Sequence, residues 1–140
     1  MKKTGSAVWS GGLKDGKGFI STQSGALDNV AYGFNTRFED GPGSNPEELI
    51  GAAHAACFTM ALSGQLDEAG LRASALKTTA EVTLEKIDGS YAITAVHLRL
   101  TASIPGASDA VFQDVALRAK LGCPVSKLLA TEVTLDAHLE

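Results

Sequence analysis

Two cysteines, Cys57 and Cys123, are the strongest candidates for chemistry in this chain of 140 residues. Cys57 lies in the apolar run GAAHAACF at residues 51–58, where a free thiol is most often a small buried hydrophobic group. Burial without a nearby cation raises the pKa of a thiol and leaves it unreactive. A catalytic role for Cys57 therefore requires a positive charge beside it.

Cys123 has a different local setting, because it precedes Pro124, a residue suited to the first position of a helix. The N-terminus of a helix presents unpaired N–H groups that stabilise a thiolate. On these local grounds Cys123 is the better nucleophile of the two. A purely structural role at a helix cap is an equally good interpretation of the same position.

His54 precedes Cys57 by three residues and shares its helix face, which allows an imidazole–thiolate pair. A structural histidine in the core is the more ordinary interpretation. A zinc site would have to combine the two cysteines with His54, His97 or His138 at irregular spacing, because the chain has no CxxC motif. We therefore expect no metal.

Arg37 lies between Phe34 and Asn45, in the segment 35–44, which contains Gly-Pro-Gly and is expected to be an irregular loop. A surface ion pair with a nearby acid such as Glu39 is an ordinary interpretation of this arginine. Glu47 and Glu48 follow in the first turn of the next expected helix, where the helix dipole favours carboxylates. For Glu48, which falls at the capping-box position, we keep that structural interpretation.

That helix is predicted from a strong start signal, in which Asn45 can cap and Pro46 suits the first helical position. It should run to about Glu68 and stop at Gly70. Its middle, residues 49–62, is apolar on nearly every face and rich in alanine, so it must be buried all round. In a chain this small, such burial suggests a partner subunit.

The other expected elements are short strands and two further helices. The strands comprise an antiparallel meander near the N-terminus, a hairpin that turns at Asp-Gly-Ser and a final strand: Gly5–Ser10, Gly18–Thr22, Val30–Phe34, Thr78–Ile87, Tyr91–Ile104 and Glu132–Leu139. The helices are expected at about Asp109–Leu121 and from Pro124 onward. This order predicts an α+β fold, with residues 1–140 as a single domain.

Composition narrows the class of protein further. Twelve Lys and Arg against 16 Asp and Glu give a net charge of −4, with no basic cluster that would bind nucleic acid or an anionic membrane. No stretch approaches the roughly 20 apolar residues of a membrane span. No secretory signal is recognisable, so we expect a cytoplasmic protein. The phosphate-loop and dinucleotide fingerprints are also missing, and no cofactor is expected.

Four motifs together resemble a known family: GFNTRF at 33–38, NPEEL at 45–49, AAHAACF at 52–58 and GCPVS at 122–126. They are similar to those of the OsmC/Ohr family of thiol-dependent peroxidases, and the similarity spans nearly the whole chain. The position of Arg37 after Asn35 and Thr36 favours the OsmC branch over the organic hydroperoxide resistance branch.

The resemblance implies an OsmC-like fold, with antiparallel sheets around a long buried central helix in an intertwined homodimer whose sheets have six strands. It also implies reduction of organic and, more weakly, inorganic hydroperoxides in defence against oxidative and osmotic stress. Carried over by residue, Cys57 matches the peroxidatic cysteine, Cys123 the resolving cysteine, Arg37 the arginine beside the reactive sulfur and Glu47 the glutamate that holds it. The family uses an external dithiol reductant, whose identity here is unknown.

The resemblance overrules the local preference for Cys123 as the nucleophile, since an arginine can activate Cys57. It also creates a geometric problem. Glu47 and Cys57 are ten residues apart in one predicted helix, or about 15 Å at 1.5 Å per residue. Either the helix begins after Glu47, or Arg37 and Glu47 serve Cys57 of a partner chain. We favour the second hypothesis.

Two other functions stay open at this point. One is a thiol–disulfide oxidoreductase or thioester hydrolase that uses the same two sulfurs, although CxxC and an evident catalytic triad are missing. The other is a dimeric module that binds an apolar ligand, with incidental cysteines. Peroxide consumption by the wild type but not by Cys57→Ser would separate the peroxidase from both.

Overall fold

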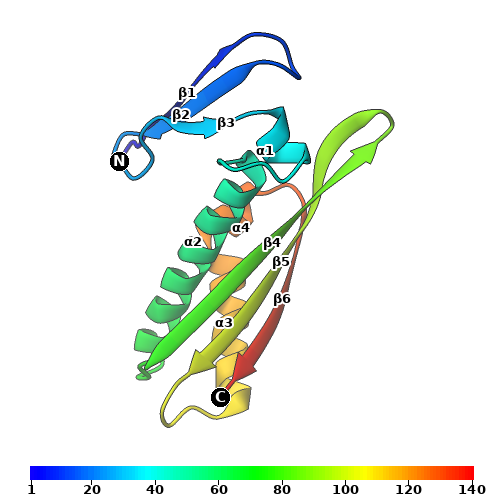
Figure 1. The fold of residues 1–140 in the computed structure, drawn as a ribbon. Coiled ribbons are helices and arrows are strands. Elements are labelled where there is room, and N and C mark those ends of the chain that lie inside the picture. Colours follow the sequence, from blue (N-terminus) through cyan, green and yellow to red (C-terminus); the bar gives the residue numbers. More distant parts are fainter. The chain divides into compact units, whose positions relative to one another are not determined.

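Two three-stranded sheets and four helices make up the mixed α+β structure of this chain (Figure 1). The computed structural model describes residues 1–140. The chain divides into two compact units, Met1–Leu49 and Ile50–Glu140, which we call the first and second units. Each unit contains one of the sheets.

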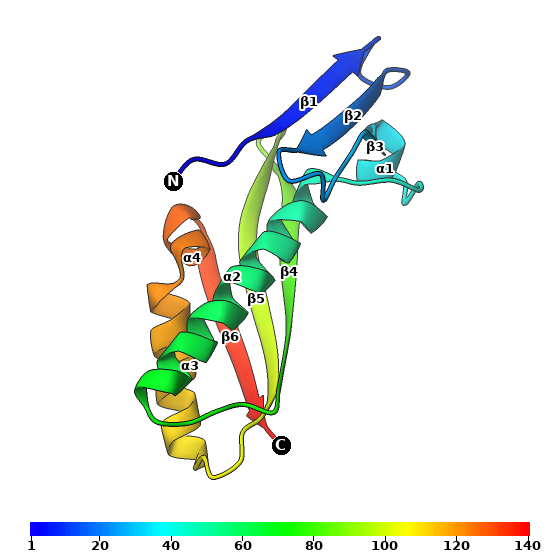
Figure 2. The same cartoon turned by 90° about the vertical axis from the view of Figure 1, so that its left-hand side faces the viewer.

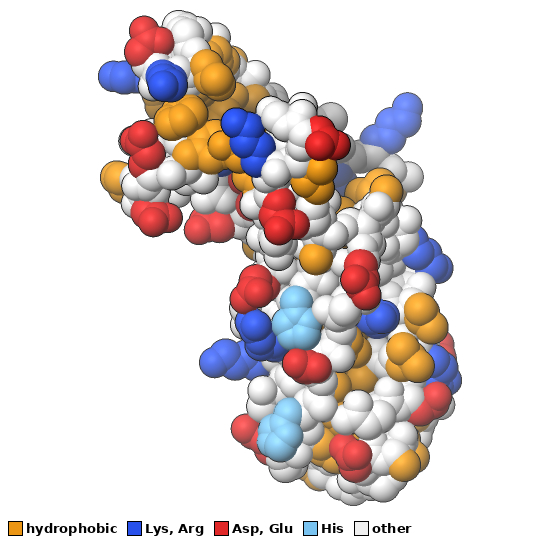
Figure 3. Space-filling model, turned by 90° about the vertical axis from the view of Figure 1, so that its right-hand side faces the viewer, with side chains coloured by type: hydrophobic (Ala, Val, Ile, Leu, Met, Phe, Trp, Pro, Cys, Tyr) orange, Lys and Arg blue, Asp and Glu red, His pale blue; other side chains and the backbone are white.

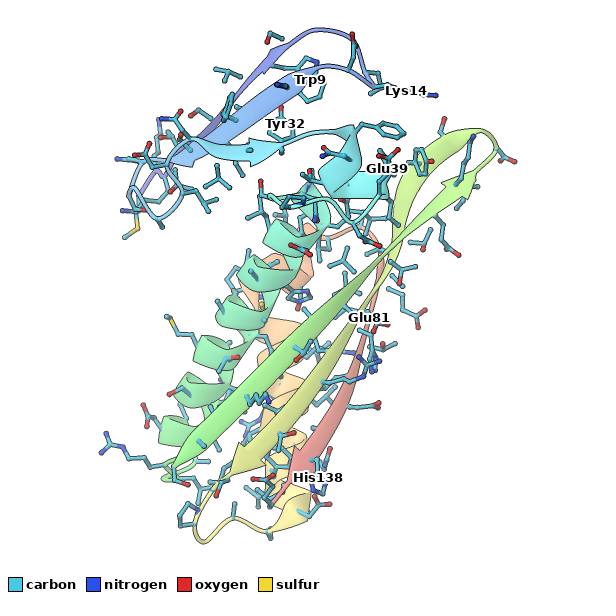
Figure 4. The ribbon with its side chains drawn as sticks, in the orientation of Figure 1. Trp9, Lys14, Tyr32, Glu39, Glu81 and His138 are labelled. Carbon is cyan, nitrogen blue, oxygen red and sulfur yellow. The ribbon has the colours of Figure 1, made fainter.

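The first unit holds an antiparallel meander of β1 (Gly5–Ser10), β2 (Lys17–Thr22) and β3 (Val30–Tyr32). On this sheet the rings of Trp9 and Tyr32 pack with centroids 5.4 Å apart (Figure 4). A Cβ atom at Gly18 would collide with both rings, so this packing requires a glycine there.

The third strand ends two residues earlier than predicted, because the chain turns at Gly33 into a short helix, α1 (Phe34–Phe38). The Thr36 hydroxyl holds this turn: its Oγ1 accepts from the Gly33 N–H at 2.9 Å. The prediction of an irregular loop over residues 35–44 was therefore wrong for its first four residues, which belong to α1.

Helix α2 (Pro46–Glu68) forms as predicted. The side-chain oxygen of Asn45 accepts the Glu48 N–H at 2.8 Å, and Gly70 follows the helix with a φ of 70°. Within this chain one face of α2 is buried, through Gly51, His54, Phe58, Leu62 and Leu66. Complete burial of the helix is not observed in the single chain, where Met60 is 78% exposed.

The length and apolar character of α2 also meet the criterion for a membrane-spanning helix, contrary to the expectation that no such stretch exists. A core helix meets the same criterion. The buried residues of α2 pack in the core of the second unit, together with residues of the sheet and of α3. From Ile50 onward, where the second unit begins, α2 is therefore a core helix of that unit.

The sheet of the second unit has the order β4 (Ala75–Ile87), β5 (Ser90–Ser103) and β6 (Glu132–Leu139). The β4–β5 hairpin turns at Asp88 and Gly89, which have φ values of 49° and 85°. Strand β6 pairs with β5 in parallel, so the expectation of purely antiparallel sheets was wrong. A parallel pair needs a crossover, which α3 (Asp109–Gly122) and α4 (Pro124–Leu128) supply.

Helices α2 and α3 both lie on one face of this sheet (Figures 1 and 2). Between them and the sheet lies the core, whose largest members are Phe58, Leu62, Leu66, Leu98, Leu100, Phe112 and Val115. The opposite face carries acidic, basic and histidine side chains (Figure 3), including an ion pair between Arg99 and Glu81 at 3.0 Å. The sheet thus has one apolar and one polar face.

Candidate active site

The second unit brings the two cysteines together, although they are 66 positions apart in the chain. Their Sγ atoms lie 3.1 Å apart and both thiols are free. Cys57 is half-buried in the middle of α2, whereas Cys123 is fully buried between α3 and α4. A disulfide bond is about 2.05 Å long. The two sulfurs therefore need to approach by only about 1 Å to bond.

The sequence places Cys123 at a break between two helices. Pro124 lacks an N–H and restricts the residue before it to an extended conformation, so α3 ends at Gly122. Cys123 takes that conformation, with φ −60° and ψ 122°, and serves as the N-cap of α4. Its side chain is then directed toward the first turn of α4 and toward Cys57.

The pKa values of the two thiols move in opposite directions. Burial raises the pKa of Cys57. The Val125 backbone N–H opposes burial less strongly, and the interaction with Cys123 adds to the increase. Burial also acts to raise the pKa of Cys123. Hydrogen bonds from the Ser126 backbone and hydroxyl, from Cys57 and from the Val125 backbone outweigh it and lower that pKa. Within the second unit, Cys123 is therefore the more acidic thiol.

His54 contacts Ser126, a residue that sequence reasoning did not single out. The histidine is fully buried, and its Nε2 lies 2.7 Å from Ser126 Oγ. Burial lowers the pKa of His54, so its ring is neutral at pH 7, and its Nδ1 has no hydrogen-bond partner. The sequence signals for Ser126 were its place in the motif GCPVS and its position three residues after Cys123, which places it in the first turn of α4.

The first unit brings Arg37 and Glu47 together. Arg37 Nε lies 3.1 and 3.2 Å from the two carboxylate oxygens of Glu47, and Nη2 lies 2.6 Å from Oε1. Such a bidentate pair fixes the plane of the guanidinium. Arg37 also lines a mostly apolar hollow of about 220 Å³, whose other walls include Trp9, Leu13, Tyr32, Phe34 and Pro46.

Glu47 and Cys57 both belong to α2, which is continuous from Pro46 to Glu68. The alternative in which the helix begins after Glu47 was therefore wrong. Ten residues of helix separate the two side chains by about 15 Å along the axis.

The structure contains no group of three or more His, Cys, Asp or Glu side chains that could hold a metal ion.

Comparison with known proteins gives consistent matches. The family model for OsmC-like protein matches residues 39–138, beginning two residues after Arg37. Peroxiredoxin OsmC of Escherichia coli (strain K12) is 52% identical over 140 residues, which cover 100% of this chain and 98% of that protein.

Solved structures agree with the sequence matches. The organic hydroperoxide resistance protein OhrB of Bacillus subtilis matches with a TM-score of 0.70 and 26% identity, covering 98% of each chain. An OsmC-like protein of Mycoplasma pneumoniae has the same fold, with a TM-score of 0.77 at 13% identity over 99% of this chain and 97% of that one.

Proposed function

The chain belongs to the OsmC-like protein family, and from this premise we propose that it is a peroxidase that reduces organic hydroperoxides with its own thiols. Cys57 is the peroxidatic cysteine and Cys123 the resolving cysteine. The observation that carries this proposal is the 3.1 Å separation of the two free sulfurs. Exposure supports the division of roles, since Cys57 is the half-buried and Cys123 the fully buried thiol.

In the first step the Cys57 thiolate attacks the O–O bond of the hydroperoxide. The O–O bond breaks, an S–O bond forms, and the alkoxide takes a proton and leaves as the alcohol. In the second step the Cys123 sulfur attacks Cys57 Sγ: the S–S bond forms, the S–O bond breaks, and hydroxide leaves with a proton as water. An external dithiol then reduces the disulfide and becomes a disulfide itself.

The first step needs a cation, because burial raises the pKa of Cys57. Arg37 supplies it, held by Glu47 through the bidentate pair. Since α2 keeps Glu47 about 15 Å from Cys57 of its own chain, this pair serves Cys57 of a second copy. The working enzyme is therefore an intertwined homodimer. Its two subunits cover the exposed face of α2 and join their three-stranded sheets into six-stranded ones.

An organic substrate fits the apolar character of the candidate site. The hollow beside Arg37 is lined by aromatic and aliphatic side chains, which favour an alkyl or aryl group over water. Hydrogen peroxide has no such group, so it should be the weaker substrate.

The proposed cycle suits a reducing compartment such as the cytoplasm, which keeps both thiols reduced. There the activity serves defence against oxidative and osmotic stress. No prosthetic group takes part in this cycle.

A single-turnover titration tests the proposal. Reduced protein receives one equivalent of cumene hydroperoxide, and the Cys57 and Cys123 peptides are then analysed by mass spectrometry. We expect a stoichiometric Cys57–Cys123 disulfide in the wild type and oxidised Cys57 alone in Cys123→Ser. Cys57→Ser should consume no peroxide. Survival of both wild-type thiols would overturn the peroxidase and leave a module that binds an apolar ligand.

A further inference from the structure

His54 is the buried titratable group that the proposed cycle does not use. It lies one helical turn before Cys57 on α2, yet its contact is with α4, where its Nε2 lies 2.7 Å from Ser126 Oγ. Its ring is fully buried, and Nδ1 faces no hydrogen-bond partner. Burial of a polar ring with one unpaired nitrogen is costly, so a purely structural position would be better filled by an apolar side chain.

The direction of the His54–Ser126 hydrogen bond follows from the surroundings of Ser126. A neutral imidazole carries its proton on one nitrogen only. A proton on Nε2 makes His54 the donor to Ser126 Oγ, and the Ser126 hydroxyl hydrogen is then free to form its hydrogen bond with Cys123 Sγ. A proton on Nδ1 would leave a buried N–H unpaired and would turn the Ser126 hydroxyl toward the histidine, away from the sulfur. The first arrangement satisfies more of the buried groups.

We propose that His54 and Ser126 are positioning residues for the resolving thiol: His54 Nε2–H holds the Ser126 hydroxyl, which donates to Cys123 Sγ and aims that sulfur at Cys57. This inference rests on the proposed peroxidase cycle and concerns its second step. A thiolate that is fully buried needs hydrogen-bond donors around it, and the Cys57 S–H is lost when that sulfur is oxidised to the sulfenic acid. The Ser126 hydroxyl persists through that change.

The electron and proton balance of the step is that of disulfide formation. Cys123 gives up its proton, its sulfur attacks Cys57 Sγ, and the hydroxyl released from the sulfenic acid takes that proton and leaves as water. Ser126 and His54 lose no proton in this sequence. Through their hydrogen bonds they stabilise the negative charge on Cys123 Sγ until the S–S bond forms.

The other charged groups near Ser126 are Lys120 on α3 and Lys127 on α4, which line a cavity of about 280 Å³ together with Ser126. Lys120 Nζ donates to the Val133 carbonyl at 2.9 Å, so its ammonium group is already engaged.

The first test is independent of peroxide. The Cys123 thiolate is titrated by its ultraviolet absorbance in Cys57→Ser protein, alone and combined with Ser126→Ala or His54→Leu. Loss of one hydrogen bond to a charged group should raise the Cys123 pKa by about one unit in each combination. His54→Gln should preserve the lower pKa, since its amide N–H reaches the position of Nε2, whereas His54→Asn places its amide at Nδ1 and should not.

The second test follows disulfide formation after one equivalent of cumene hydroperoxide. Ser126→Ala and His54→Leu should slow disulfide formation roughly threefold to tenfold. A higher Cys123 pKa lowers the fraction of Cys123 present as thiolate, but it also makes each remaining thiolate more nucleophilic, which limits the effect. More Cys57 should then reach the sulfinic acid. His54→Gln should restore the rate. His138→Gln, on an exposed histidine of β6 (Figure 4), is the matched control and should leave the rate unchanged.

The outcomes separate this inference from the peroxidase itself. An unchanged Cys123 pKa in the Ser126→Ala and His54→Leu proteins overturns the positioning role, whatever the peroxide result. Equal slowing by His54→Gln and His54→Asn in folded proteins also overturns it, because a packing role would not distinguish them by nitrogen position. A wild type that fails to consume peroxide overturns the proposed function, and the thiolate titration still decides whether His54 and Ser126 act on Cys123.

Discussion

The more acidic of the two thiols in the site is not the more accessible one. Cys123 has the lowered pKa but is fully buried, so no peroxide can reach its sulfur without a movement of the chain. Cys57 is accessible but has the raised pKa. A peroxidase that attacks with Cys57 must therefore bring in a cation from outside the second unit, which is the role proposed for Arg37.

The buried His54 predicts how stability depends on pH. Its pKa is lowered in the folded protein, so between that value and the unfolded value of about 6.5 the unfolded chain binds more protons. Folding stability should then fall as the pH drops below 6.5, by at most about 1.4 kcal/mol per pH unit. Urea denaturation at pH 7 and pH 5.5 measures this. The wild type should lose more stability than His54→Gln, and equal losses would contradict the assignment.

Residue types and motifs identified the two cysteines and paired them, but the sequence did not reveal that His54 and Ser126 meet beside them. The contact between His54 and Ser126 joins side chains 72 positions apart in the chain, and it forms only because α4 packs against α2. The His54–Cys57 pair suggested by their spacing is not the contact that forms. Spacing along a helix shows which side chains share a face, whereas it does not show what that face meets.

At the scale of elements, the cap of α2 connects the fold to the candidate site. Asn45 accepts the Glu48 N–H at 2.8 Å and also donates to the Thr36 carbonyl at 3.3 Å, so one side chain joins α1 to the start of α2. Arg37 and Glu47 lie on these same two elements. Loss of Asn45 should therefore disturb both stability and the Arg37–Glu47 geometry.

Asn45→Ala should lower the free energy of unfolding by about 1 kcal/mol, the usual effect of losing a helix cap. It should also lower kcat/KM for cumene hydroperoxide, because Glu47 sits in the first turn. Asn45→Asp, which keeps the accepting oxygen, is the control and should retain most of the stability. Urea denaturation and initial rates measure the two effects. Full activity in the alanine variant would show that the cap does not position Glu47.

Local signals predicted the elements that have local causes. Helix α2 matches its predicted bounds because Asn45 and Pro46 mark its start and Gly70 its end. The final strand also matches its predicted bounds, because its side chains alternate between two faces. Helix α1 was missed, since its stability comes from Thr36 bonding back to Gly33 within a loop that otherwise contains Gly-Pro-Gly. The parallel pairing of β6 with β5 depends on the crossover and has no signature within β6 itself.

At the scale of the whole molecule, the single chain leaves two requirements unmet. The apolar surface of α2 is covered on one face only, and Met60 remains 78% exposed. The Arg37–Glu47 pair lies at the start of α2, whereas Cys57 lies near its middle. The proposed homodimer would meet both requirements at once, since in a two-fold dimer each subunit presents the same surface to the other.

A mixture of two inactive chains tests this arrangement. One chain carries Arg37→Ala and keeps Cys57, and the other carries Cys57→Ser and keeps Arg37. If Arg37 acts across the interface, the heterodimer pairs an intact Cys57 with an intact Arg37 at one of its two sites. Random exchange makes about half of the dimers mixed, so the mixture should recover about a quarter of the wild-type activity.

The measurement is the initial rate of cumene hydroperoxide reduction after the two variants are unfolded together and refolded. Each variant refolded alone gives the background. Native mass spectrometry of the refolded mixture shows whether mixed dimers have formed. A mixture of wild type with the double variant Arg37→Ala/Cys57→Ser is the reciprocal control: it should keep about a quarter of the wild-type activity if Arg37 acts across the interface, because mixed dimers then have no complete site, and about half if Arg37 acts within its own chain. Recovery above background requires that the two side chains come from different subunits, because no single chain in the first mixture contains both. If exchange is demonstrated but activity stays at background, Arg37 acts within its own chain, and α2 must then bend or break between Glu47 and Cys57 during turnover.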